Sequence, residues 1–477
     1  MYTNPLWSRI LRTLPQFRKA FSRNKTFLWF CCLTLATALR TDLSGVTSLA
    51  RSLGGKSKVY DCLLGFFASE AVNLNVLTRI WARMLSSHKM ALKVNGRILL
   101  VVDGIKAPKS GRLMPAVKKL FQHSTSNTKP AYITGHSCQN IAILLGSLTG
   151  VFAVPFLTRI LEGLRFTPKD KESQIAKLPD ILEDVLGHLP FYLVADAYYA
   201  SGAFALSLVS MSGHLITRAK GNAVAYLPFQ KTGKQKRGRP QQYGKKISLK
   251  TLSKESSVFV EVESPVYGER GVKILYREVI LLWKPLGKKV KFVIVKHPTR
   301  GKKGGSFYLM TTDLDLDALD LIYIYGLRFK IEVSFKSAIH SVGTFAYHFW
   351  TSSMKKRSRA SGDQYVHRES EKNVEKIKMK MNAYHVHLQI GNITQGILQI
   401  LALEMPHHVA ALDRHYRRTI CELPTEATVA AALKSSAWIF DGMTDDPEQC
   451  VNQMQNAMDL AGQGVANSAE FGVFTGT

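Results

Sequence analysis

Hydrophobic residues divide the chain into blocks of different periodicity. In residues 1–92, apolar residues recur at helical spacing in Thr41–Leu53 and Asp61–Leu85, which the Gly54-Gly55 break separates. The apolar run Phe27–Leu39 is shorter than the roughly 20 residues that span a bilayer, so we expect a buried helix and no membrane segment. Residues 1–92 are therefore predicted to form a helical N-terminal domain.

Residues 93–213 have the pattern of buried strands alternating with helices. Arg97–Asp103 and Phe191–Ala195 are continuous apolar runs of strand length, and each leads into an aspartate. Ile141–Leu157 is interrupted by Ser147, Thr149, Gly150 and Pro155, which indicates two buried strands around a turn. Helical spacing follows in Lys171–Leu186 and Gly202–Met211. This order predicts a mixed α/β sheet with flanking helices.

The remaining sequence predicts a β-rich insertion and then more helices. Residues 214–316 hold strand-like stretches between loops rich in Gly, Lys and Arg, namely Leu215–Ala219, Val258–Val262, Lys273–Trp283 and Lys291–Lys296. Residues 317–349 contain a long helix from Asp317 to about His340. Residues 350–477 are predicted to be a C-terminal helical region, with a helix at Ala383–Leu403 and a flexible tail after about Asp441.

The charge balance indicates a polyanionic partner. Lys and Arg number 64 against 35 Asp and Glu, a formal net charge of +29. Such a surplus repels itself unless a polyanion compensates it, and nucleic acid gains further affinity from counterion release. The six cysteines are scattered without a CxxC pair, which argues against a zinc site or a disulfide framework and fits a reducing compartment.

Two aspartates at strand ends are the first candidate site residues. Asp103 follows one buried strand and Asp196 another, and such positions lie at the rim of an α/β sheet. Two carboxylates brought together there repel each other unless a cation lies between them, and Mg²⁺ suits such a site. The structural alternative is that either aspartate begins a turn or caps the next helix.

A polar stripe on the long helix supplies the third carboxylate. Its members are three or four residues apart and share one helical face: Tyr325, Arg328, Glu332, Lys336 and His340. The opposite face carries Leu327, Ile331 and Ala338, which can pack on the sheet. The alternative is an ordinary surface ion-pair ladder worth a few tenths of a kcal/mol per pair.

The segments VVDG (101–104), LVADAYYAS (193–201) and YGLRFKIE (325–332) resemble the three signature regions of DDE transposases of bacterial insertion sequences. The resemblance is to the cut-and-paste group and covers roughly residues 95–345. It implies an RNase H-like mixed sheet with flanking helices and a β-strand insertion before the last catalytic helix. The helical N-terminal domain lies outside the resemblance, and its basic character and its place in the chain suggest that it binds DNA ends.

The same resemblance implies that Asp103, Asp196 and Glu332 are both the catalytic residues and the ligands of two Mg²⁺ ions, with Mn²⁺ as a substitute. Tyr325, Arg328 and Lys336 would contact DNA. The family's signature ends in a lysine seven residues after the glutamate, where this chain has Ile339. This departure puts the role of that lysine in doubt.

A basic segment in the insertion is a further DNA-binding candidate. Lys234–Pro240 (KQKRGRP) offers Lys236, Arg237 and Arg239, and two arginines around a glycine can lie in a narrow minor groove. The alternative is a solvated linker.

The function implied by the resemblance is DNA transposition. Hydrolysis at the transposon ends would free a 3′ hydroxyl, which would attack target DNA. The expected partner is double-stranded DNA, both transposon ends and target, bound by a homodimer that is cytoplasmic and nucleoid-associated in a bacterium. The alternatives are an RNase H-like nuclease without strand transfer and a non-catalytic or regulatory DNA-binding protein of the same fold.

Overall fold

The computed structural model describes residues 4–122, 128, 130–147, 150–170, 172–230, 241–298, 305–358, 361–412, 423–436 and 444–470, with the backbone alone at 256 and 463–470. The chain divides into two compact units. The helical unit comprises Met1–Met90, Gly104–Lys171 and Val333–Thr477, and the sheet unit comprises Ala91–Asp103 and Glu172–Glu332. Strand β2 (Arg97–Pro108) and helix α10 (Lys330–Ser337) each begin in the sheet unit and end in the helical unit.

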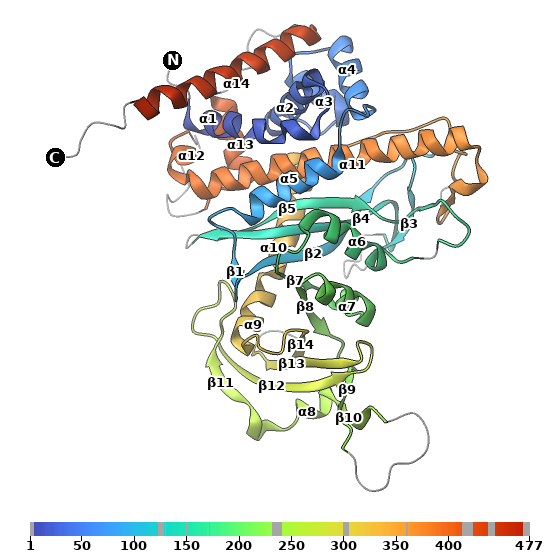
Figure 1. The fold of residues 1–477 in the computed structure, drawn as a ribbon, viewed down its shortest axis with the longest axis vertical. Coiled ribbons are helices and arrows are strands. Elements are labelled where there is room, and N and C mark those ends of the chain that lie inside the picture. Colours follow the sequence, from blue (N-terminus) through green and yellow to red (C-terminus); the bar gives the residue numbers. More distant parts are fainter. Residues whose placement is uncertain are drawn as a thin grey trace, which may run out of the picture. The chain divides into compact units, whose positions relative to one another are not determined.

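In the helical unit, most helices surround α11 (Glu371–Glu404), which lies along strand β5 (Figure 1). The remaining elements are α1 (Pro5–Thr13), α2 (Asn24–Leu39), α3 (Gly45–Ser52), α4 (Ser57–Phe67), α5 (Leu74–Ser86), β3 (Lys118–Phe121), β4 (Tyr132–Ser147), β5 (Gly150–Ile160), β6 (Leu164–Arg165), β15 (Gln364–Tyr365), α12 (Pro406–Leu412), α13 (Glu426–Ser435) and α14 (Pro447–Glu470). A 3₁₀ segment (Leu14–Ala20) follows α1, and a π-helical segment (Ala338–Val342) follows α10.

The two apolar runs of the sequence fold as predicted. Every residue from Phe27 to Ala38 in α2 is buried, because the helix packs against α3, α4, α11, α13 and α14 on different sides. The run Ile141–Leu157 forms the antiparallel pair β4 and β5. Among the described residues, no helix is long and apolar enough to cross a membrane.

The C-terminal tail corrects a prediction. We expected the sequence after Asp441 to be flexible, but residues 447–470 form α14, which packs against α1, α2 and α4. Its buried residues recur every three or four positions, at Cys450, Met454, Ala457 and Ala461. The polar majority of the segment conceals this narrow stripe of small and sulfur-containing side chains.

The sheet unit confirms a mixed α/β fold with a β insertion. Its strands lie in the order β10-β9-β12-β13-β14-β8-β7-β2, with β7 parallel to both β2 and β8 and the insertion strands antiparallel. The elements are β1 (Lys93–Val94), α6 (Gln174–Leu186), β7 (Phe191–Ala195), α7 (Gly202–Ser210), β8 (Gly213–Ala219), β9 (Val224–Pro228), β10 (Tyr243–Ser248), α8 (Leu249–Leu252), β11 (Val260–Glu263), β12 (Lys273–Trp283), β13 (Lys288–Lys296), β14 (Ser306–Thr311) and α9 (Ala318–Gly326). The sequence analysis did not identify β9, β10 and β14.

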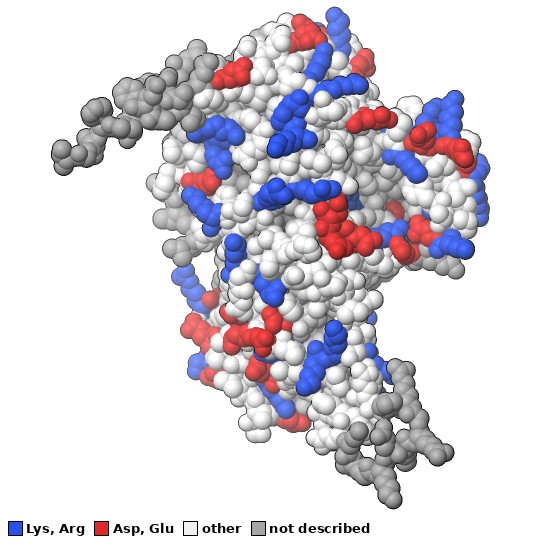
Figure 2. Space-filling model, viewed as in Figure 1, with Lys and Arg blue, Asp and Glu red and all other residues white. Residues whose placement is uncertain are grey.

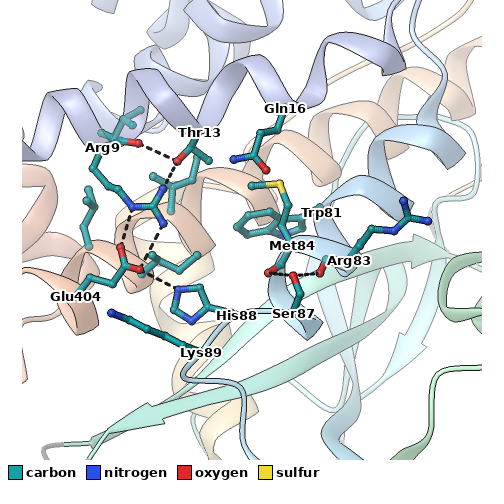
Figure 3. Close-up of a pocket in the computed structure, with 14 residues that line it drawn as sticks. Arg9, Thr13, Gln16, Trp81, Arg83, Met84, Ser87, His88, Lys89 and Glu404 are labelled. Atoms are coloured by element: carbon teal, nitrogen blue, oxygen red, sulfur yellow. Dashed lines mark hydrogen bonds and ion pairs between the residues drawn. The ribbon is translucent and has the colours of Figure 1, made fainter. Parts of the chain in front are cut away.

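The N-terminal helices belong to the same unit as the C-terminal helices, whereas the sequence suggested a separate domain at residues 1–92. A half-buried ion cluster connects them. Glu404, near the end of α11, accepts hydrogen bonds from Arg9 Nε of α1 at 2.8 Å and lies 3.0 Å from His88 Nε2, just after α5 (Figure 3). Although burial alone would raise the pKa of Glu404, the contacts with His88 and Arg9 lower it to about 2.

We expect Glu404→Gln to lower the free energy of unfolding by about 2 kcal/mol at neutral pH. This figure is discounted because the Arg9 side chain is 33% exposed. Because the carboxyl pKa is lower in the folded protein than in the unfolded chain, its contribution is complete above about pH 4.5 and is lost as the pH falls toward 2. Denaturant unfolding at several pH values measures this, with exposed Glu375→Gln on α11 as the control. A cost that stays constant across that range would contradict the assignment.

Candidate active site

The register of two parallel strands brings Asp103 and Asp196 together. Residues of β2 and β7 pair from Ile98 with Phe191 up to Val101 with Val194. Asp103 and Asp196 each lie two residues beyond the last of these pairs, Asp103 still within β2 and Asp196 directly after β7. Residues at matching positions of adjacent strands point to the same face of the sheet. Both aspartates are therefore at the carboxyl end of the parallel strands.

Asp196 also has the structural role that was the alternative prediction. Its side chain caps the 3₁₀ turn Ala197–Tyr199 by accepting a hydrogen bond from the Tyr198 amide at 2.9 Å. Its backbone carbonyl accepts a hydrogen bond from the hydroxyl of Thr217 on β8 at 2.6 Å. Capping uses one carboxylate oxygen, Oδ1, so the role does not exclude ligand binding through Oδ2.

Glu332 belongs to an interrupted helix. The predicted long helix is α9, a 3₁₀ turn at Leu327–Phe329 and α10 in succession. Leu327 and Ile331 are fully buried and anchor it, as predicted from their face of the helix. The Glu332 side chain points away from that core and is 57% exposed.

Arg328 connects the helix glutamate to the strand aspartate. Its Nη1 donates to Asp103 Oδ2 at 3.1 Å, and its Nη2 donates to Glu332 Oε1 at 2.7 Å. The Arg328 and Asp103 side chains are only 19% and 22% exposed, so this contact is partly shielded from water. Burial alone would lower the pKa of Arg328, but Tyr325, Asp103 and Glu332 raise it, and the guanidinium stays charged.

Two tyrosines complete the electrostatic environment. Burial raises the pKa of Tyr199, and the negative charges of Asp103 and Asp196 raise it further, so its hydroxyl stays protonated. Burial also raises the pKa of Tyr325, where Arg328 and Arg218 oppose the effect and Asp196 adds to it. Tyr325 was predicted from its place in the helix stripe. Tyr199 was missed, although it lies in the YY pair three residues after Asp196 and could have been noted there.

The three carboxylates do not form a compact cluster. Within the described part of the chain, no three His, Cys, Asp or Glu side chains are close enough to hold a metal ion together. Arg328 lies where a cation would join Asp103 to Glu332. The two aspartates, by contrast, are adjacent hard oxygen donors of the kind that Mg²⁺ or Mn²⁺ accepts.

The other predicted residues are distributed differently. Lys336, one turn after Glu332 on α10, is exposed and belongs to the helical unit, as does Ile339, which is 40% exposed. Lys236, Arg237 and Arg239 lie outside the described residues. Of two tryptophans, Trp283 is buried and Trp350 is 63% exposed.

A pocket of about 480 Å³ in the helical unit lies among α1, α5 and α11 around the Glu404 cluster, and none of the three acids lines it (Figure 3).

Comparison with known proteins gives a family match over residues 16–266, just over half of the chain, described as DDE superfamily endonuclease. The match includes Asp103 and Asp196 and ends before Glu332. No curated protein matches. Among solved structures, the chain is similar to a piggyBac transposase synaptic complex with hairpin DNA, at 11% identity and a TM-score of 0.33, over 92% of this chain and 72% of that one.

We expect Thr217→Val to lower the free energy of unfolding by about 1 kcal/mol, because it removes the buried hydroxyl that binds the Asp196 carbonyl at nearly constant volume. Denaturant unfolding measures the loss. Thr37→Val is the matched control, since the buried Thr37 hydroxyl bonds back to Leu33 of its own helix and should cost less. Equal losses of unfolding free energy at the two positions would show that the hydrogen bond from Thr217 to the Asp196 carbonyl adds no particular stability.

Proposed function

Because the chain belongs to the DDE superfamily of endonucleases, we propose that it is a DNA transposase whose catalytic residues are Asp103, Asp196 and Glu332. The reaction would be metal-dependent hydrolysis of a phosphodiester bond at each transposon end, followed by strand transfer of the freed 3′ hydroxyl into target DNA.

One observation carries this proposal. The register of β2 and β7 puts two aspartates side by side, and Arg328 joins one of them to the glutamate of a helix that is distant in sequence. Carboxylates that gather at one place repel each other unless a cation compensates them, and here Arg328 does so for Asp103 and Glu332. A site for a divalent cation and a phosphodiester would account for this arrangement.

The donor set fits divalent metal ions by its chemistry. Asp103 and Asp196 would hold the ions, and Glu332 would join them when Arg328 releases its carboxylate. When bound, a pair of divalent ions stabilises the attacking and the leaving oxygens of an in-line displacement. The oxygen ligands suit Mg²⁺, with Mn²⁺ as a substitute.

The protein's own residues would do the rest. Arg328, once released, carries a bidentate guanidinium suited to a phosphate oxygen pair, one helical turn before Glu332. Tyr325 and Tyr199, both held neutral, can donate hydrogen bonds from their hydroxyl groups without adding negative charge to the site. Lys336 would contact the DNA backbone further along α10.

The two chemical steps use the same groups. In the first, the oxygen of a water molecule forms a bond to phosphorus, the bond to the 3′ oxygen breaks, and that oxygen takes up a proton. In the second, the 3′ hydroxyl loses its proton and attacks a phosphodiester of target DNA, which releases the target's own 3′ oxygen. Only the nucleophile differs, so a protein nucleophile is not required.

The partners follow from the reaction and the charge. Double-stranded DNA at both transposon ends would be paired by a homodimer, and the net charge of +29 favours a polyanion. Lys236, Arg237 and Arg239 stay candidates for minor-groove contacts, and residues 1–92 for recognition of the ends.

We expect Asp103→Asn, Asp196→Asn and Glu332→Gln each to reduce cleavage of DNA bearing the element's ends roughly a thousandfold or more, while binding in EDTA is unchanged. Cleavage and strand-transfer products are separated on denaturing gels, and binding is measured by electrophoretic shift. Exposed Asp180→Asn on α6 is the charge-matched control. Wild-type cleavage without divalent metal would contradict the proposal, and cleavage without any strand transfer would favour the nuclease alternative.

We expect Arg328→Met to tighten Mn²⁺ binding about tenfold, because the side chain that competes for Asp103 and Glu332 is gone. Without metal, the same variant should melt at a lower temperature, since the carboxylates lose their compensating cation. Calorimetric Mn²⁺ titration and thermal melting measure the two effects, and Arg328→Lys, which keeps the charge, should change both less. Unchanged or weaker Mn²⁺ binding in Arg328→Met would exclude competition between the Arg328 guanidinium and the metal ion for these carboxylates.

A further inference from the structure

A second basic site lies in the helical unit, in the segment that leads into α11. It is a pocket of about 250 Å³, and its lining includes Lys355, Lys356, Arg357 and Arg368 together with Ser361 and Tyr365. On the face drawn in Figure 2, Lys and Arg side chains are interspersed with Asp and Glu. The net charge of the chain therefore does not locate an anion site, whereas a local cluster of cations does.

Positive charge exceeds negative charge around this pocket. The one carboxylate in its lining, Glu369, forms an ion pair with Lys355 at 3.1 Å. Lys356 and Arg368 have no carboxylate partner among the residues that the structure describes. Arg357 is only 6% exposed, and both burial and the neighbouring Arg112 lower its pKa. Two guanidinium groups therefore repel each other here, and an anion would relieve that repulsion.

The two arginines, Arg357 and Arg368, are held in place before any ligand binds. Arg112 Nε donates to the Arg357 carbonyl at 3.0 Å, and Arg357 Nη1 donates to the carbonyl of Ser358 at 2.9 Å. The guanidinium of Arg368 lies over the ring of Tyr365, 4.8 Å from its centroid. The short strand β15 is fixed by Gln364, whose side-chain oxygen accepts a hydrogen bond from the Ala116 amide at 2.8 Å. Such preorganisation lowers the entropy cost of binding.

We propose that this pocket binds a phosphate group, held by Lys356, Arg357 and Arg368. Arginine forks and lysine ammonium groups are the usual partners of phosphate, and a buried arginine surrounded by further cations suits a multiply hydrogen-bonded oxyanion. The two possible sources are a phosphodiester of bound DNA and a free phosphate. We assign the DNA backbone, and this choice of source rests on the proposed function, whereas the phosphate site itself does not.

The test measures binding without catalysis, in EDTA, with inorganic phosphate by calorimetry and with a random-sequence duplex over a range of salt concentrations. Lys356→Gln with Arg368→Gln changes two surface side chains, and Arg357→Gln is the buried counterpart. Lys372→Gln with Lys376→Gln removes the same charge from exposed positions of α11 that do not line the pocket. Thermal melting checks that each variant is folded.

We expect the pocket double variant to lose about tenfold in affinity for inorganic phosphate and for the duplex, and its salt slope to fall by about 0.9 for one lost phosphate contact. The α11 control should change neither. Loss of phosphate binding with unchanged duplex binding would reject the DNA backbone and leave free phosphate as the ligand. Equal losses in the control, or no phosphate binding by the wild type, would overturn the site. Because this experiment measures binding and not cleavage, a negative result would reject the phosphate site without testing the proposed catalytic role of Asp103, Asp196 and Glu332.

Discussion

The bridge from Arg328 to Asp103 and Glu332 is the interaction on which the candidate site of the sheet unit depends. Parallel pairing of β2 with β7 requires Asp103 and Asp196 to be neighbours, and in this structure Arg328 supplies the positive charge that the first of them needs. The same guanidinium holds Glu332, so one side chain fixes the geometry of a strand and a helix together. Tyr199 stays protonated because burial raises its pKa and the negative charges of Asp103 and Asp196 raise it further.

The rest of the sheet unit keeps these groups in position. Thr217 on β8 holds the backbone at Asp196, and Leu327 and Ile331 anchor the helix that carries Arg328 and Glu332. The 3₁₀ turn at Leu327–Phe329 lies at the arginine itself, yet the four-residue spacing from Arg328 to Glu332 still allows their hydrogen bond. The protein thus combines an aspartate within β2 and an aspartate directly after β7 with a helix glutamate that Arg328 holds.

The sequence predicted elements that are buried on every side, and it predicted the buried face of a helix that packs on one neighbour. Phe191–Ala195 and α2 are such cases, and Leu327 and Ile331 lie on the buried face as expected. Prediction from the sequence failed for helices that bury only a narrow stripe of their surface. In the first turns of α11 only Ile377 and Met381 are buried among charged residues, and α14 buries a thin stripe of small side chains. The spacing of the polar stripe predicted the Arg328–Glu332 contact. The bridge to Asp103 could not be predicted, since it depends on a contact 225 residues apart.

The helical unit is assembled from three separate stretches of the chain, and this has a consequence for biosynthesis. Helix α2 is apolar on all sides and packs against α11, α13 and α14, which are synthesised much later. Throughout translation of the intervening sequence, α2 lacks most of its native partners and exposes a surface prone to aggregation. A nascent or prematurely terminated product would therefore depend on chaperones or be degraded, so only full-length polypeptide would accumulate.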